Sequence, residues 1–118
     1  MYFKEVPRCG DLGLMRVLLE FEGSPVVSIM KNDYNEYFIY HCTEIRSEFQ
    51  GYIIKATTDT IVKFITKEIT LADVYLEESY VIKTVEKQAS KIEYSVVLTC
   101  DVDDLDFPPD DWYLEFIS

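Results

Sequence analysis

The sequence has one histidine, three widely spaced cysteines and no glycine-rich loop. A single histidine excludes a zinc site built from several imidazoles. Cys9, Cys42 and Cys100 form no CxxC pair, which argues against a zinc knuckle or a thioredoxin-type site and predicts three reduced thiols. The four glycines match no phosphate-binding pattern. We therefore expect no enzyme, no catalytic residue, no metal site and no cofactor.

Long apolar runs are also missing. No stretch approaches the roughly 18 uninterrupted apolar residues of a membrane-spanning helix, and the N-terminus lacks the apolar run of a signal peptide. A net charge of −11 disfavours binding to anionic lipid surfaces. Glycine and proline are scarce, at four each, and 48 % of the residues are hydrophobic. This composition argues against a low-complexity or globally disordered chain. We expect a single compact cytoplasmic domain, 1–118.

Several segments have the residue pattern of β-strands. Residues 15–22 alternate, with Met15, Val17, Leu19 and Phe21 on one side. Residues 92–100 alternate in the same way, with Ile92 and Cys100 at the two ends of one face. Further strands are expected at residues 26–31, 36–43, 52–56 and 80–85, separated by turn residues. Short connections between consecutive strands predict an antiparallel meander.

The hydrophobic period changes between residues 58 and 78. Ile61, Phe64 and Ile65 follow the i, i+3, i+4 spacing of one helix face. Thr70 and Asp73 then have the spacing of a capping box, which predicts the start of a second short helix. The fold class expected from these patterns is α+β: an antiparallel β-meander of about five to seven strands, with one or two short helices inserted around residues 58–78.

The sequence suggests two candidate sites, a Cys–His pair and a calcium-binding loop, but the local pattern argues against both. His41 neighbours Cys42, but adjacent residues of a strand point to opposite faces, so they should not form a catalytic pair. We expect the His41 ring at the sheet surface. Residues 101–112 begin like a calcium-binding EF-hand loop, but Asp106 replaces its glycine and Trp112 its final glutamate. A looser Mg²⁺ or Ca²⁺ site made from two or three of these carboxylates stays open.

Negative charge is concentrated at the C-terminal end. No lysine or arginine follows Lys91, and the last 27 residues hold eight carboxylates, whereas residues 1–91 carry a net charge of only −3. Such a block attracts cationic partners and repels nucleic acid. Trp112, Leu114 and Phe116 have the alternate spacing of a final strand that covers the core. We therefore expect the acidic segment, 101–118, to pack on the domain.

These features favour a non-enzymatic protein-interaction module that binds a basic protein partner through an acidic face. An immunity or antitoxin-type inhibitor, or an accessory subunit of a bacterial or phage defence system, would fit. The residues expected to bind the partner are Asp101, Asp103, Asp104, Asp106, Asp110, Asp111, Trp112 and Tyr113. The alternatives are a nucleic-acid mimic that inhibits a DNA-binding protein, and a small enzyme that uses a divalent metal or His41. A homo-oligomer is left open.

Four segments also support a resemblance at the family level. They are Glu22-Gly23-Ser24-Pro25 with the strand that follows, residues 35–40, residues 69–76 and residues 104–114. Together they span roughly residues 20–115, and the chain resembles a family of small bacterial domains of unknown function. The resemblance implies a bacterial or phage cytosolic setting and brings no catalytic residue with it.

Overall fold

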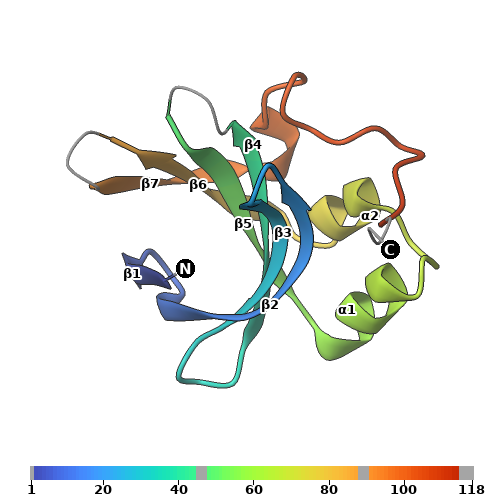
Figure 1. Cartoon of the computed structure of the whole chain (residues 1–118), viewed down its shortest axis with the longest axis horizontal. Coiled ribbons are helices and arrows are strands. Elements are labelled where there is room, and N and C mark those ends of the chain that lie inside the picture. The colour runs from blue at the N-terminus through green and yellow to red at the C-terminus, as the bar shows by residue number, and fades with distance from the viewer. Residues whose placement is uncertain (1, 45–47, 88–90, 115–118) are drawn as a thin grey trace.

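The computed structural model describes residues 2–44, 48–87 and 91–114. Seven antiparallel strands lie side by side in the order of the chain (Figure 1). They are β1 (Tyr2–Val6), β2 (Gly10–Phe21), β3 (Ser24–Lys31), β4 (Tyr37–Glu44), β5 (Gln50–Ala56), β6 (Tyr80–Glu86) and β7 (Ile92–Leu98). Between β5 and β6 the chain forms α1 (Thr58–Ile65) and α2 (Leu71–Leu76), and a 3₁₀ turn, η2 (Thr99–Asp101), follows β7.

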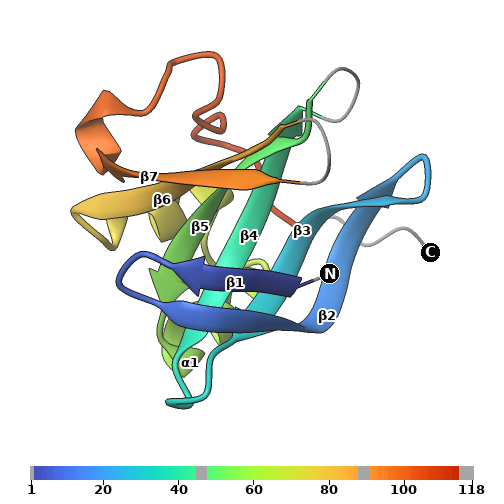
Figure 2. The ribbon, with the colours of Figure 1, turned by 90° about the vertical axis from the view of Figure 1, so that its left-hand side faces the viewer.

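The predicted antiparallel meander with two short helices is confirmed. The α+β label fits less well, because helices of only eight and six residues accompany a seven-stranded sheet that coils toward a barrel (Figure 2). β1 was not predicted from the sequence. Its five residues include Lys4 and Glu5, which hide the alternating pattern.

The coiling of the sheet brings its two edge strands together. The rings of Phe3 in β1 and Tyr94 in β7 have centroids 6.3 Å apart, and the Lys4 backbone N–H donates to the Tyr94 hydroxyl. The Arg8 guanidinium lies 4.5 Å from the centroid of the Tyr80 ring in β6. β1 and β7 are nevertheless the two ends of the hydrogen-bonded strand order. The barrel is therefore closed by side chains and not by a continuous backbone ladder.

The sheet is buried on both faces. The concave core is built from Phe3, Val6, Cys9, Leu12, Met30, Phe38, Tyr40, Cys42, Ile53 and Ile82. The second core lies between the sheet and the helices and includes Val27, Ile39, Tyr52, Ile54, Phe64, Val74, Tyr75 and Leu114. Strand β4 alternates between the two, so His41 and Cys42 lie on opposite faces, as predicted.

The predicted inward faces of two strands are wrong in part. In β2 the side chains of Met15 and Phe21 are exposed, whereas Leu12 and Leu18 are buried. Register shifts along the β2–β3 pair explain the difference, because each bulge adds a residue and turns the following side chains to the other face. In β7, Val96 and Leu98 are exposed, because this edge strand is only partly covered.

Local capping positions the second helix. The Thr70 hydroxyl accepts a hydrogen bond from the Asp73 N–H at 3.1 Å, and the Asp73 carboxylate accepts one from the Thr70 N–H at 3.0 Å. The predicted capping box is therefore confirmed. It starts α2 at Leu71 and turns Leu71, Val74 and Tyr75 toward the sheet, where all three are buried. Tyr75 thereby comes to lie against β4 and β5.

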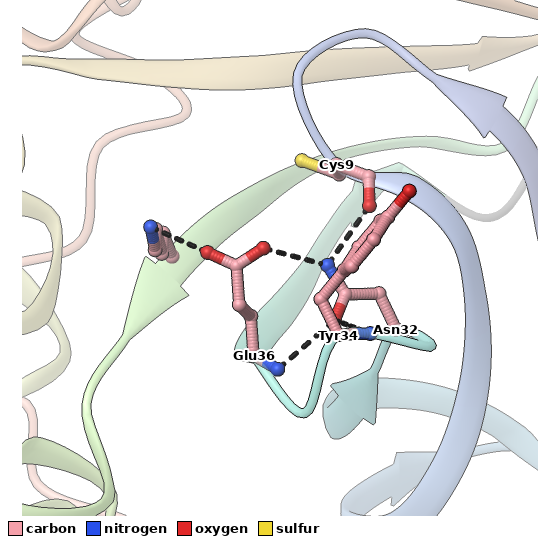
Figure 3. A network of polar contacts seen from close by, with 5 residues as sticks. Cys9, Asn32, Tyr34 and Glu36 are labelled. Atoms are coloured by element: carbon pink, nitrogen blue, oxygen red, sulfur yellow. Dashed lines mark hydrogen bonds and ion pairs between the residues drawn. The ribbon is translucent and has the colours of Figure 1, made fainter.

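A buried asparagine ties two turns together (Figure 3). The Asn32 amide donates to the Cys9 carbonyl and to a Glu36 carboxylate oxygen, both at 2.9 Å. Its own oxygen accepts from the backbone N–H groups of Tyr34 and Glu36, at 3.0 and 2.9 Å. Glu36 also pairs with Lys55 at 2.7 Å. The turn between β3 and β4 is thus held against the turn that follows β1.

Candidate functional site

The acidic segment is anchored to the helix side of the domain. Figure 1 shows it leaving β7 and running along α2. Three of its own side chains, Val102, Pro108 and Leu114, are buried. The backbone N–H of Leu71, at the start of α2, donates to the Trp112 carbonyl at 3.2 Å. The acidic segment is therefore anchored to the core at several points between residues 101 and 114.

Five aspartates of this segment face solvent: Asp101, Asp103, Asp104, Asp110 and Asp111. We call them the acidic surface. A tight turn orders its centre, because the N–H groups of Asp106 and Phe107 both donate to the Asp103 carbonyl at 2.9 Å. The Asp103 carboxylate in turn accepts from the Leu105 N–H at 2.9 Å. At this turn the Leu105 side chain is 93 % exposed.

Asp106 differs from its neighbours. Its side chain is half-buried, and one oxygen, Oδ2, accepts a hydrogen bond from the Tyr52 hydroxyl of β5 at 2.8 Å. Burial is the main cause that raises the pKa of Tyr52 well above its ordinary range, and the hydrogen bond to the Asp106 carboxylate is the second. The Asp106 side chain therefore reaches from the acidic segment to the sheet. The sequence pattern had grouped it with the exposed aspartates.

His41 lies on the same side of the sheet as Asp106. Its Nδ1 is 2.7 Å from the Tyr75 hydroxyl, and the two rings meet edge to face with centroids 5.9 Å apart. Contrary to expectation, the ring does not lie at an open sheet surface, because the acidic segment and α2 cover this face; the residue is half-buried. Burial lowers the pKa of His41 to about 4, and Asp106 opposes this shift only in part. His41 is therefore neutral at pH 7.

The Tyr75 hydroxyl sets the tautomer of this neutral ring. Tyr75 is fully buried, and among the described residues its hydroxyl has no acceptor other than His41 Nδ1. A buried hydroxyl proton without an acceptor is costly. Tyr75 therefore donates to Nδ1, and the proton of the neutral imidazole resides on Nε2. His41 Nε2 is then a hydrogen-bond donor without a partner in the described part of the chain.

The two aromatic candidates have different environments. Trp112 is half-buried and packs near Phe64, with ring centroids 6.4 Å apart, whereas Tyr113 is 44 % exposed. The final strand predicted at residues 112–116 is not formed by Trp112, Tyr113 or Leu114, because the Trp112 carbonyl bonds to the start of α2 instead of a neighbouring strand. Leu114 is buried, as predicted, and Phe116 lies outside the described residues.

A cavity of about 350 Å³ lies between the acidic segment and the sheet. Its polar wall includes His41 and Asp106, and its apolar wall includes Leu19, Val26, Val27, Leu71, Phe107, Pro108 and Trp112. Sequence reasoning missed this cavity, because His41 and Asp106 come from segments far apart in the chain. Only the position of His41 on the same strand face as the core residue Ile39 could have suggested a covered histidine.

The described residues contain no group of side chains arranged to bind a metal ion. Across residues 2–44, 48–87 and 91–114, no three His, Cys, Asp or Glu side chains gather in a way that could hold a metal ion. The looser cation site considered for the acidic segment therefore gains no support there. Within the same residues, no helix is long and apolar enough to cross a membrane.

Comparison with known proteins gave no match: no family model fits the chain, and no curated protein or solved structure is significantly similar to it. The resemblance to a family of small bacterial domains therefore has no family model behind it.

Proposed function

We propose that this protein is a non-enzymatic interaction module that binds a basic protein partner through the acidic surface. An immunity or antitoxin-type inhibitor of a basic effector, or an accessory subunit of a bacterial or phage defence system, would act in this way. The observation that carries the proposal is the anchoring of five exposed aspartates on a segment packed against the core. A recognition surface that is ordered before binding loses less entropy when the partner docks.

The charge of the acidic surface is available to a partner. Among the described residues, Glu36 pairs with Lys55 and Asp59 with Lys63, and the aspartates of the acidic surface take part in neither pair. Uncompensated charge of one sign attracts an oppositely charged protein over several ångströms and raises the association rate. The proposal therefore predicts association that slows steeply as salt is added.

Exposed apolar side chains supply the second part of the surface. Leu105 is 93 % exposed and Tyr113 is 44 % exposed, and both lie in the acidic segment. Burial of such side chains against a partner provides binding energy, while the surrounding carboxylates select a basic surface. Trp112 contributes less than its residue type suggests, because it is half-buried against the core.

A capture experiment with matched charge variants tests the proposal. The immobilised protein is exposed to host extract beside a variant in which Asp103, Asp104, Asp110 and Asp111 are changed to Asn. A control variant loses four exposed carboxylates elsewhere, through Glu20→Gln, Asp33→Asn, Glu48→Gln and Glu77→Gln. We expect one basic protein to bind the wild type and the control at low salt, and not the acidic-surface variant.

The captured protein is then purified for kinetics. We expect its association rate constant to fall steeply with salt. Equal retention by all three baits would overturn the proposal. Displacement of the partner by duplex DNA would instead favour the nucleic-acid-mimic alternative.

A further inference from the structure

Among the described residues that line the cavity beneath the acidic segment, Asp106 is the one charged group at pH 7. His41, the other acid–base residue there, is neutral at this pH. The Tyr52 hydroxyl bonds to Oδ2 of Asp106, whereas Oδ1 has no hydrogen-bond partner among the described residues. A half-buried carboxylate with a free oxygen gains most from a cationic ligand, since the cation offsets its lost hydration.

The rest of the lining suits a flat cation on an apolar stem. The acidic segment contributes Phe107, Pro108 and Trp112 to the lining, and the rest of the domain contributes the apolar side chains Leu19, Val27 and Leu71. A guanidinium group stacks on aromatic faces, and it pairs with a carboxylate through directed N–H groups. The methylene groups of an arginine can lie against the apolar wall. At about 350 Å³ the cavity is near the lower end of ligand pockets, a size suited to a side chain and not to a large cofactor.

The position of the cavity indicates where the cation comes from. Residues 105–109 line it, and the exposed carboxylates Asp103, Asp104, Asp110 and Asp111 flank those residues in the chain. A basic protein drawn to the acidic surface therefore presents its cationic side chains beside the cavity. From this geometry we infer that the cavity receives an arginine side chain of the partner, with its guanidinium on Asp106. The inference rests on the proposed function for the source of the arginine.

A neutral His41 favours this occupant. A protonated imidazole beside Asp106 would compete with the guanidinium for the carboxylate. As a neutral ring, His41 instead offers its Nε2–H to an acceptor, and the backbone carbonyl of an arginine residue is such an acceptor. The cavity thus matches both the cation and the peptide part of the residue.

The experiment uses a defined ligand, N-acetyl-arginine N-methylamide, and the whole protein. The chain has one histidine and one tryptophan, and both line the cavity, so the His41 imidazole and Trp112 indole NMR signals report occupancy without ambiguity. We expect both signals to shift and saturate together. The corresponding citrulline derivative has the same shape without the charge and should give no saturable shift, and the lysine derivative should bind more weakly.

Variants separate the cavity from the acidic surface. Asp106→Asn keeps an oxygen for the Tyr52 hydroxyl and removes the charge, and it should weaken arginine binding by about tenfold or more. The fourfold Asn variant of the acidic surface should bind the small ligand within a few-fold of wild type. Equal binding of the citrulline derivative, unchanged binding by Asp106→Asn, or no saturable shift up to the solubility limit would each overturn the inference.

The two proposals fail separately. If acidic-surface substitutions abolish partner capture while the arginine derivative does not bind, the interaction module stands and the arginine site falls. If the derivative binds through Asp106 while partner capture ignores the acidic surface, the arginine site stands and the proposed docking mode falls.

Discussion

The Tyr52 hydroxyl donates a 2.8 Å hydrogen bond to Asp106, joining β5 to the acidic segment across 54 positions of the chain. Tyr52 is 1 % exposed, so its ring is fixed within the core. The bond holds the acidic segment, which lines the cavity, against the sheet. This contact therefore connects a buried core residue to the acidic segment.

Removing this hydroxyl should destabilise the protein. Tyr52→Phe keeps the buried ring and deletes a hydrogen bond to a carboxylate, which should lower the free energy of unfolding by about 1–2 kcal/mol. Urea denaturation measures the change. The control is Tyr34→Phe, because Tyr34 is 78 % exposed and its hydroxyl makes no hydrogen bond in the described structure; we expect less than about 0.5 kcal/mol there. Similar losses for both variants would contradict the role of the contact.

The depressed pKa of His41 makes stability depend on pH. The unfolded chain takes up this proton near pH 6.5, whereas the folded protein takes it up only near pH 4. The unfolded state therefore binds more protons between these values, and the free energy of unfolding must fall as the pH falls from about 6.5 to 4, by up to about 3 kcal/mol. Above pH 6.5 this contribution is complete, and below pH 4 no more is lost.

Two measurements test the pH effect. An NMR titration of the single imidazole should give a midpoint near pH 4. Urea denaturation at pH 4.5 and 7 should show a smaller difference for His41→Gln than for the wild type. Lys55 and Asn32 lower the pKa of Glu36, so protonation of Glu36 at lower pH also reduces the free energy of unfolding. This second loss is the same in the wild type and in His41→Gln. A midpoint close to 6.5 would show that the ring is open to water.

Asn32 should be among the most sensitive polar positions. It is 4 % exposed, and its side chain makes four hydrogen bonds, three of them to backbone groups. Asn32→Ala leaves buried backbone groups without partners, so we expect a loss of about 2–4 kcal/mol in denaturant unfolding. Asp33→Ala, at the exposed neighbouring position of the same turn, should cost no more than about 0.5 kcal/mol. Comparable losses at both positions would mean that the network contributes little.

Gly51 is required by the close approach of Tyr40. A Cβ atom at this position would lie 2.6 Å from the Tyr40 hydroxyl oxygen and 2.7 Å from the His41 carbonyl oxygen. Tyr40 is buried in the concave core and cannot move freely, so Gly51→Ala should destabilise by about 3 kcal/mol. Gly23→Ala is the contrast, since its Cβ would meet nothing within 4 Å and only the positive φ of +78° opposes it, at about 1 kcal/mol. Thermal denaturation that ranks Gly23→Ala as the more harmful change would refute the steric argument.

The three thiols should react at different rates. Cys100 is exposed, whereas Cys9 and Cys42 are buried, and burial raises the pKa of Cys9 to about 11 and raises that of Cys42. A thiol reagent such as Ellman's reagent should modify one cysteine quickly in the native protein and all three in denaturant. Cys100→Ser should abolish the fast phase. Two fast thiols in the native protein would show that the sheet opens readily.

Local patterns predicted the elements of the fold well. Thr70 and Asp73 form their capping box within four residues, and β4 and β5 form at the two apolar, β-favouring runs predicted as strands. The faces of β2 could not be predicted, because bulges depend on its pairing with β3. β1 was missed for a similar reason, since its short, charged segment becomes a strand only by pairing with β2.

The candidate site was predictable only in part. The charge block and the burial of Leu114 follow from composition and alternation. The inward turn of Asp106 does not, because in the sequence it looks like the aspartates around it. Its orientation depends on Tyr52, and that of His41 depends on Tyr75, which is 34 positions away. Contacts between such distant positions exist only once the chain has folded.

One segment serves as both the outer charged surface and the wall of the cavity beneath it. Side-chain substitutions at Asp110 or Asp111 can change the charge and leave the lining of the cavity as it is. An insertion or deletion within residues 105–112 cannot, because it moves the exposed carboxylates and the cavity wall together. Changes in the length of this segment should therefore be tolerated only with compensating changes on the strands that face it.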